Sequence, residues 1–192
     1  IAEALTLPGE STLTEQMEIV DPELLFAARC GLARFLAHGL ESDLLRLYHA
    51  LAPTAPYQPD NLGAARRRLR NLCLGYLNEL DSPEYRTLAR QQFDATDNMT
   101  DQFAALAVLA NATGEEGDRA LADFYARWQG EALVVDKWLA VQSSSRLPGT
   151  LARVESLTQH AAFDIRNPNK VYALLRTFGA NHRHFHAADG TG

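Results

Sequence analysis

The sequence has little of what several large protein classes need. Only two cysteines occur among its 192 residues, Cys30 and Cys73, which lie far apart within apolar helical patterns. We therefore expect buried, reduced thiols rather than a disulfide framework. No stretch approaches the roughly 20 apolar residues of a membrane span, and the start shows no signal-peptide pattern. These absences predict a cytoplasmic protein without a membrane partner.

Positive charge is also scarce. The formal net charge is −6 and the sequence pI is about 5.5, whereas nucleic-acid scaffolds usually present a basic face. No nucleic-acid partner is therefore expected. The one dense basic run is ARRRLR, in which Arg66, Arg67 and Arg70 share one side of a predicted helix. We interpret it as a solvated face paired with nearby acids, with an anion or carboxylate site as the alternative.

Motifs for catalysis are missing as well. None of the six histidines precedes a glutamate, so the chain has no His-Glu-x-x-His zinc motif. It has no nucleophile elbow and no glycine-rich loop after a strand. Asp94, Asp97 and Asp101 could serve acid–base chemistry, but helix punctuation explains them better, with Asn98 or Thr100 capping the next helix. We assign no catalytic residue.

The chain stops on NHRHFHAADGTG, which brings His182, His184, His186 and Asp189 together in sequence. These are residue types that bind zinc. Alternation by two aligns the three imidazoles only on an extended segment, and the flanking residues give no strand signal. We favour an inter-helix turn with no metal-binding residue, and keep a small metalloprotein built on these histidines as a hypothesis. Both ends look cut, since Ile1 is not a methionine and the last glycine lies in a loop-like DGTG.

Helical signals recur from end to end, while strand signals are nearly absent. Cap-then-proline pairs open helices at Asp21–Pro22, Ser82–Pro83 and Asn167–Pro168, and Pro148 opens another. Gly39 is expected to end the first helix. The loop APTAPYQPDN contains three prolines. We expect helices over about 21–39, 41–50, 62–80, 83–93, 101–111, 114–130, 132–142, 148–157 and 167–178.

The apolar residues of these helices fall at three- and four-residue spacing. The first helix gathers Leu24, Leu32 and Phe35 on one face, and the last should turn Leu174 and Leu175 inward, with Val171 and Phe178 beside them. Trp128 and Trp138 are expected to be core anchors. Short helices in series predict an all-α fold, an α-solenoid of antiparallel pairs of the armadillo or HEAT kind, without a crisp internal repeat. A compact all-α bundle is the alternative.

Six stretches are specific in combination. They are IVDPELLFAAR, RRRLRNLCLGYL, QFDATDNMTDQFAAL, VVDKWLAVQ, NPNKVYALLRTF and FHAADGTG. In this order, from about residue 16 to residue 192, they resemble the C-terminal helical domain of the bacterial aminopeptidase N family. The members of this family are M1 zinc metallopeptidases. The terminal match includes Phe185, His186, Asp189 and the glycines but not His182 or His184.

The resemblance implies that residues 1–192 are most of one C-terminal domain, truncated at both ends and without an internal boundary. The intact enzyme would be a monomer with membrane alanyl aminopeptidase type activity, removing N-terminal amino acids from peptides. Its zinc ligands would lie in an upstream catalytic domain, so this chain alone should be inactive and hold no cofactor. Its partners would be that catalytic domain and the peptide substrates.

The same resemblance assigns a role to the last predicted helix. In the family this helix faces the internal cavity, and some relatives carry an arginine where this chain has Tyr172. It therefore implies that Asn169, Tyr172 and Arg176 line the substrate-cavity wall. The whole domain would cap the cavity and restrict which peptides reach the active site. The alternative from another class is a stand-alone helical-repeat scaffold that binds a protein or peptide partner.

Overall fold

A computed structural model describes residues 2–187 and 189–191. All regular structure in this part of the chain is helical, as the sequence predicts. None of its helices is both long enough and apolar enough to cross a membrane. The chain divides into two compact units, Ile1–Leu109 and Ala110–Gly192, which are described separately. That residues 1–192 form one domain stays a prediction.

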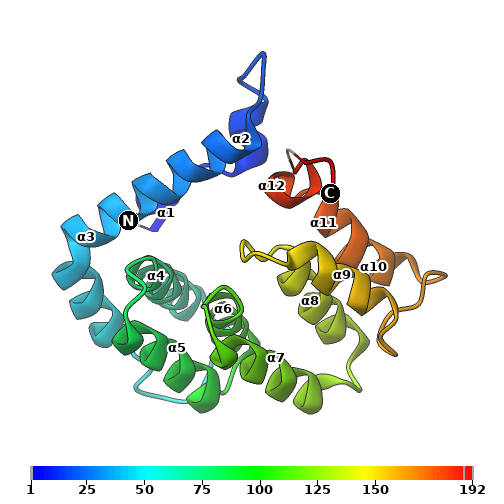
Figure 1. Cartoon of the computed structure of the whole chain (residues 1–192). Helices are drawn as coiled ribbons and strands as arrows, with labels where there is room; N and C mark the ends of the chain where they lie inside the picture. Colours follow the sequence, from blue (N-terminus) through cyan, green and yellow to red (C-terminus); the bar gives the residue numbers. More distant parts are fainter. Residues whose placement is uncertain (1, 188, 192) are drawn as a thin grey trace. The chain divides into compact units, whose positions relative to one another are not determined.

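The first unit is built on α3 (Pro22–Ala50), α4 (Asn61–Asn78), α5 (Pro83–Ala95) and α6 (Met99–Leu109). Two short helices, α1 (Ala2–Leu5) and α2 (Glu10–Thr14), precede them. Helix α3 packs against α4, and α5 lies beside α6 (Figure 1). Along α6 no side chain from Asp101 to Leu109 is exposed, which agrees with its nearly all-apolar sequence. The core contains Leu44, Leu74, Leu77, Phe93 and Leu106.

Helix α3 is one helix of 29 residues, so the predicted stop at Gly39 is wrong. A glycine ends a helix by taking a left-handed conformation, and Gly39 does not have a positive φ. Ala37 and Leu44 are both buried, on either side of it. Because burying both requires a continuous helix, their packing outweighs the cost of about 1 kcal/mol for a glycine in a helix interior.

The N-terminal half of α3 keeps its apolar stripe uncovered. Leu24 is 68%, Leu32 47% and Phe35 74% exposed. With the exposed Ala28 these residues recur at helical spacing, and we call them the open face of α3. The start of the helix is as predicted, since the Asp21 side chain accepts a hydrogen bond from the Leu24 amide at 3.0 Å. Contiguous exposed apolar surface is typical of contact sites, so the open face of α3 is a candidate contact surface.

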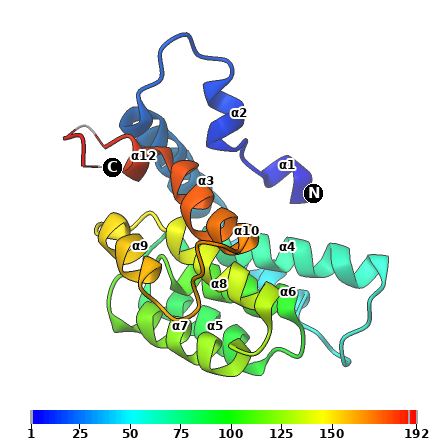
Figure 2. The same cartoon turned by 90° about the vertical axis from the view of Figure 1, so that its right-hand side faces the viewer.

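The second unit contains α7 (Glu115–Trp128), α8 (Ala132–Ser143), α9 (Thr150–Thr158), α10 (Pro168–Val171), η1 (Tyr172–Arg176), α11 (Thr177–Gly179) and α12 (His182–Phe185). Helix α8 contacts α7, α9 and the π-helical turn η1. Figure 2 shows α10, η1 and α11 as one continuous rod. Helix α9 begins two residues after Pro148, because Gly149 takes a left-handed φ of 81° and forms a turn first.

Trp138 is a core anchor, as predicted. It is 6% exposed, and its indole Nε1 donates to the Leu121 carbonyl at 2.9 Å. Tyr125 and His160 pack their rings on it at centroid distances of 4.6 and 5.2 Å. Trp128 is only half-buried.

The two thiols also differ from each other. Cys73 is buried, and burial raises the pKa of its thiol, whereas Cys30 is half-buried. Both cysteines are free thiols, as expected. Because only Cys73 is buried, the expectation that both thiols are buried holds for Cys73 alone.

Candidate functional site

The residues assigned to the cavity wall share the outer side of the α10–η1–α11 rod. Asn169, Tyr172 and Arg176 are all exposed, and Tyr172 keeps 56% of its surface. The Arg176 guanidinium lies over the Tyr172 ring, 5.6 Å from its centroid. Asn169 belongs to the first turn, where its amide donates to the Asn167 side chain at 3.0 Å. The rod therefore presents an aromatic ring and a cation next to each other on its surface.

A π-helical turn sets which side chains reach this surface. From Tyr172 to Arg176 the backbone turn is wider than in an α-helix, and the Thr177 hydroxyl donates to the Tyr172 carbonyl at 3.1 Å. The inserted residue shifts the helical phase. Leu174 is fully buried, whereas Leu175 is 36% exposed and does not point inward as the spacing predicts. π-Turns occur frequently at functional sites.

A buried ion pair fixes the rod to α8. The Lys170 ammonium lies 2.7 Å from Asp136 Oδ1 and donates to the Ala132 carbonyl at 3.0 Å. The two side chains are only 10% and 18% exposed. Sequence reasoning missed this pair, because Asp136 and Lys170 lie on different helices and Asp136 is followed directly by another charged residue, Lys137. Lys170 follows Asn169 directly, so the pair connects the helix that carries the surface residues to α8.

The three terminal histidines do not form one array. Residues His182–Phe185 are helical, so alternate side chains diverge. His182 and His186 come together one turn apart, with ring centroids 6.0 Å from each other. Among the described residues, no group of three or more His, Cys, Asp or Glu side chains is placed to hold a metal ion.

Asp189 closes the terminal turn. Its Oδ1 accepts from the Thr191 hydroxyl at 2.7 Å and from the Thr191 amide at 3.1 Å. These hydrogen bonds lower the pKa of the Asp189 carboxyl. Gly190 supplies a left-handed φ of 72°, as expected for the DGTG turn, while Gly192 lies outside the described residues.

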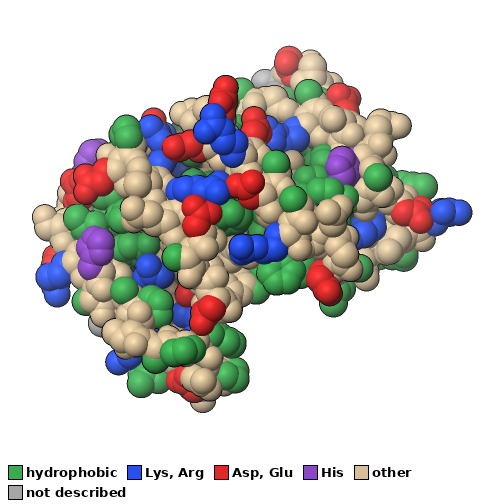
Figure 3. Space-filling view, turned by 90° about the horizontal axis from the view of Figure 1, so that it is seen from below, with side chains coloured by type: hydrophobic (Ala, Val, Ile, Leu, Met, Phe, Trp, Pro, Cys, Tyr) green, Lys and Arg blue, Asp and Glu red, His purple; other side chains and the backbone are tan. Residues whose placement is uncertain are grey.

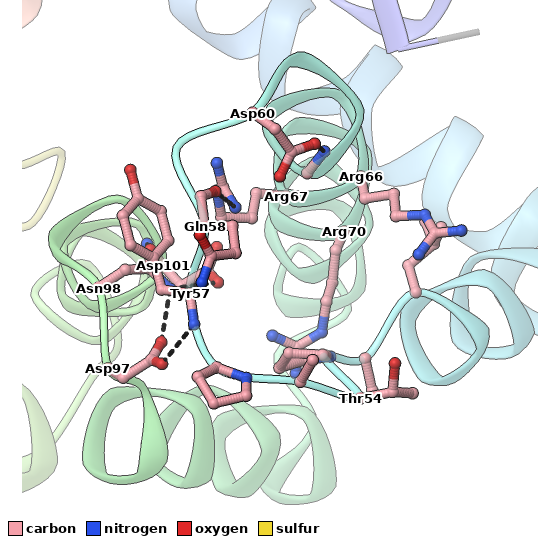
Figure 4. Close-up of a pocket in the computed structure, with 16 residues that line it drawn as sticks. Thr54, Tyr57, Gln58, Asp60, Arg66, Arg67, Arg70, Asp97, Asn98 and Asp101 are labelled. Atoms are coloured by element: carbon pink, nitrogen blue, oxygen red, sulfur yellow. Dashed lines mark hydrogen bonds between the residues drawn. The ribbon is translucent and has the colours of Figure 1, made fainter.

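A pocket in the first unit gathers the basic run of α4 under the proline-rich loop. It has a volume of about 180 Å³ and is lined by residues 51–58, by α4 and by the start of α6. Arg66, Arg67 and Arg70 of α4 all line it, and Figure 4 shows Arg67 and Arg70 pointing toward the loop while Arg66 points to the other side. Arg67 stacks on Tyr57, with its guanidinium carbon 4.7 Å from the ring centroid, and Arg70 stacks on Tyr48 at 4.4 Å.

The predicted pairing of these arginines with acids is not what the structure shows. Within the described chain, Arg66, Arg67 and Arg70 form no ion pair. Elsewhere charges do alternate, and on the face drawn in Figure 3 acidic and basic side chains are interspersed. Arg67 and Arg70 instead use aromatic faces, which attract cations through the ring quadrupole.

The acids of the pocket cap helices and hold the loop. Asp97 accepts a hydrogen bond from the Tyr57 amide at 2.8 Å, which lowers the pKa of Asp97, with a further contribution from Asn98. Asp60 caps α4 through the Gly63 amide at 2.8 Å, and this bond lowers the pKa of Asp60. Both carboxylates therefore serve the backbone of the loop and of α4.

Asp101 is the buried member of this group. It is 2% exposed and accepts from the side-chain amides of Asn71 at 2.8 Å and Asn98 at 3.0 Å. The Asn98 side chain accepts in turn from the Asp101 amide at 2.9 Å, which confirms Asn98 as the cap of α6. Asp94 pairs with Arg90 on the surface of α5. The aspartates are structural, as predicted, but the burial of Asp101 was not foreseen.

Comparisons with known proteins identify the fold. A family model described as "Domain of unknown function (DUF3458_C) ARM repeats" matches residues 1–192. The chain is 35% identical over 192 residues to aminopeptidase N of Escherichia coli, covering 100% of this chain and 22% of that protein. With aminopeptidase N of Caulobacter vibrioides it shares 38% identity over 191 residues, 98% of this chain and 22% of that protein.

A solved structure agrees with these matches. The crystal structure of Legionella pneumophila aminopeptidase A in complex with aspartic acid superposes with a TM-score of 0.86 at 34% identity, over 98% of this chain and 23% of that one. The chain thus spans 22% of the length of these two curated relatives. The armadillo-type α-solenoid predicted from the helix pattern is confirmed, and the chain belongs to the DUF3458_C family of ARM-repeat domains that bacterial aminopeptidases N contain.

Proposed function

We propose that this chain is the non-catalytic C-terminal domain of a zinc aminopeptidase that removes N-terminal amino acids from peptides. In that enzyme it caps the active-site cavity and restricts which peptides enter. The observation that carries the proposal is the match of the entire chain to about a fifth of proteins named aminopeptidase N. In this proposal the zinc ligands belong to the catalytic domain of the same polypeptide; among the described residues of this chain no three His, Cys, Asp or Glu side chains are placed to hold a metal ion together.

The open face of α3 supplies a surface for that catalytic domain. Leu24, Leu32 and Phe35 present apolar area that is costly to leave in water, at about 25 cal/mol for each Å². A covering domain would remove this cost. We therefore assign the open face of α3 to the contact with the catalytic domain. The proposed enzyme is monomeric and cytoplasmic, and residues 1–192 act as one domain of it.

The rod of the second unit supplies the cavity wall. Asn169, Tyr172 and Arg176 offer an amide, an aromatic ring and a cation, which are groups that bind a peptide backbone, its side chains and its carboxylate. The support is their joint exposure and the buried Lys170–Asp136 pair that holds the rod in place. Such a wall selects peptides without taking part in bond cleavage.

The test uses the intact enzyme with Tyr172→Ala and Arg176→Ala. Each variant should leave the kcat for an alanyl chromogenic substrate unchanged, while kcat/KM for longer peptides shifts about three- to tenfold, because a lost peptide contact is worth about 1 kcal/mol. Arg127→Ala on α7 is the matched control, since Arg127 is also exposed. Peptide profiles identical to wild type at every length would exclude this wall assignment.

A second measurement tests whether catalysis and zinc binding belong to another domain. The chain of residues 1–192 alone should hydrolyse no alanyl chromogenic substrate and should bind no stoichiometric zinc by elemental analysis. Turnover that survives rigorous purification, or one zinc ion bound per chain, would contradict the assignment of catalysis to another domain. Replacing His182 and His184 with alanine then shows whether any bound metal uses the terminal histidines.

A further inference from the structure

The π-helical turn of the rod ends on a residue that bonds its first carbonyl twice. The Thr177 amide reaches back five residues to the Tyr172 carbonyl, which is the bond that defines a π-turn. The Thr177 hydroxyl donates to the same carbonyl at 3.1 Å. Thr177 therefore places two donors on one oxygen, and both hydrogen bonds span the whole turn.

The two sides of the rod are held in different ways. On the inner side Leu174 is fully buried and Phe178 is 6% exposed, so packing fixes their positions. Tyr172 and Arg176 on the outer side are exposed and gain little from packing. Because π-helical geometry is rare and occurs mostly as single turns within α-helices, the hydroxyl bond of Thr177 is a contact that stabilises this turn.

The same hydrogen bond connects the two neighbouring residues of the cavity wall. Tyr172 supplies the carbonyl, and Arg176 directly precedes the donor residue in the sequence. The Arg176 guanidinium lies 5.6 Å from the centroid of the Tyr172 ring. A bond from residue 177 to residue 172 therefore limits how far the backbone of Arg176 can move from that of Tyr172.

A threonine hydroxyl can bond a carbonyl of the preceding turn in any helix. The Thr158 hydroxyl does so at the end of α9, where it donates to the Glu155 carbonyl at 2.7 Å. What distinguishes Thr177 is its acceptor, because Tyr172 carries an exposed ring that contacts a guanidinium. Thr158 lies outside the rod and offers a comparison within the same unit.

We propose that Thr177 is a positioning residue for the cavity wall. Its hydroxyl holds the π-turn in the geometry that keeps the Tyr172 ring and the Arg176 guanidinium together on the exposed side of the rod. Thr177 is itself half-buried and acts on a peptide only through these two residues. This role rests on the proposed function, because it requires that the wall contacts peptides.

The first measurement follows hydrogen exchange of the rod amides in the intact enzyme by mass spectrometry. Thr177→Val keeps the β-branched shape and removes the donor, so the amides of residues 172–180 should exchange about three- to fivefold faster. Thr177→Ser should exchange within about twofold of wild type, because serine offers the same donor. Thr158→Val is the matched control and should leave exchange of the rod unchanged. Wild-type exchange of the rod in Thr177→Val overturns the proposal.

The second measurement compares kcat/KM for alanyl peptides of increasing length, each as a ratio to that for an alanyl chromogenic substrate. Thr177→Val should shift the ratio for longer peptides about two- to threefold, in the same direction as Tyr172→Ala. Thr177→Ser should restore the wild-type profile. In an enzyme that already carries Tyr172→Ala and Arg176→Ala, Thr177→Val should add no further shift, because it acts through those two residues.

The outcomes separate this role from the proposed function. If Tyr172→Ala and Arg176→Ala shift the peptide profile and Thr177→Val does not, the wall assignment stands and the positioning role is overturned. An undiminished shift when Thr177→Val is added to the double variant overturns it as well. If none of the three variants shifts the profile, the wall assignment fails and the positioning role fails with it.

Discussion

The ion pair between Lys170 and Asp136 offers the sharpest test of how the rod is held. Replacing one partner leaves the other charge in a site where the side chains are only 10% and 18% exposed. Removing one partner of a fully buried ion pair lowers the free energy of unfolding by about 3–5 kcal/mol, because the other charge stays buried without compensation. The remaining exposure here admits some water, so we expect Lys170→Met or Asp136→Leu to lower the free energy of unfolding by about 2–3 kcal/mol.

The double variant separates this mechanism from simple loss of packing. With both charges replaced by apolar side chains nothing charged stays buried, and such replacements are often close to neutral. We expect the double variant to lose less than either single one, with a coupling energy of about 2 kcal/mol or more. Losses that simply add would refute the argument that the penalty comes from a stranded charge.

The assay follows urea unfolding by tryptophan fluorescence. Both tryptophans, Trp128 and Trp138, lie in the second unit, so the signal reports the unit that contains the pair. Arg166→Met is the matched control, because the Arg166–Asp164 pair is exposed, at 87% and 49%. Its loss should change the free energy of unfolding by less than about 1 kcal/mol.

Three further perturbations test other features. Gly39→Ala should raise the free energy of unfolding by about 1 kcal/mol, because a Cβ there meets nothing within 4 Å; a lower denaturation midpoint would argue against a continuous α3. Asp101→Ala should cost about 2–4 kcal/mol in the same assay, because the Asn71 amide loses its acceptor; a cost under about 0.5 kcal/mol would contradict this. The hydrogen bond to Glu41 raises the pKa of Tyr85 to about 12. The stabilisation that it gives is complete below pH about 10 and is lost as the pH rises toward about 12. Ultraviolet titration of tyrosinate should show Tyr85 ionising last and Glu41→Gln lowering its pKa.

Helix starts were predictable because their causes are local. At Asp21, Ser82 and Asn167 a side chain accepts an amide one turn ahead or nearer, and a proline follows directly. These pairs involve residues within one turn, so the sequence displays both partners. Asn98 caps α6 in the same local way, since its side chain accepts from the amide of Asp101 three residues ahead.

Features that depend on distant residues could not be read in the same way. Glycine is common just after the end of a helix, which is why Gly39 predicts a stop, but the buried residues on either side of it keep α3 continuous. Leu175 fits an apolar stripe, and a single π-turn moves it to the surface. Arg67 and Arg70 stack on rings that lie in other segments of the chain, at Tyr57 and Tyr48. In each case the deciding contact is tertiary, and the local pattern carries no sign of it.

The open face of α3 shows a third situation. Its apolar spacing predicted correctly that Leu24, Leu32 and Phe35 share one side of a helix, yet the rest of the first unit leaves them exposed. Helical periodicity reports that a surface is adapted to burial, and it does not say which molecule buries it. Under the proposed function, this chain is one part of an enzyme as long as the aminopeptidase N relatives, of which it matches 22%, and another domain of that enzyme would cover this face. A polar substitution such as Phe35→Glu should therefore disturb the intact enzyme more than it disturbs the isolated chain, because only the intact enzyme would bury that position.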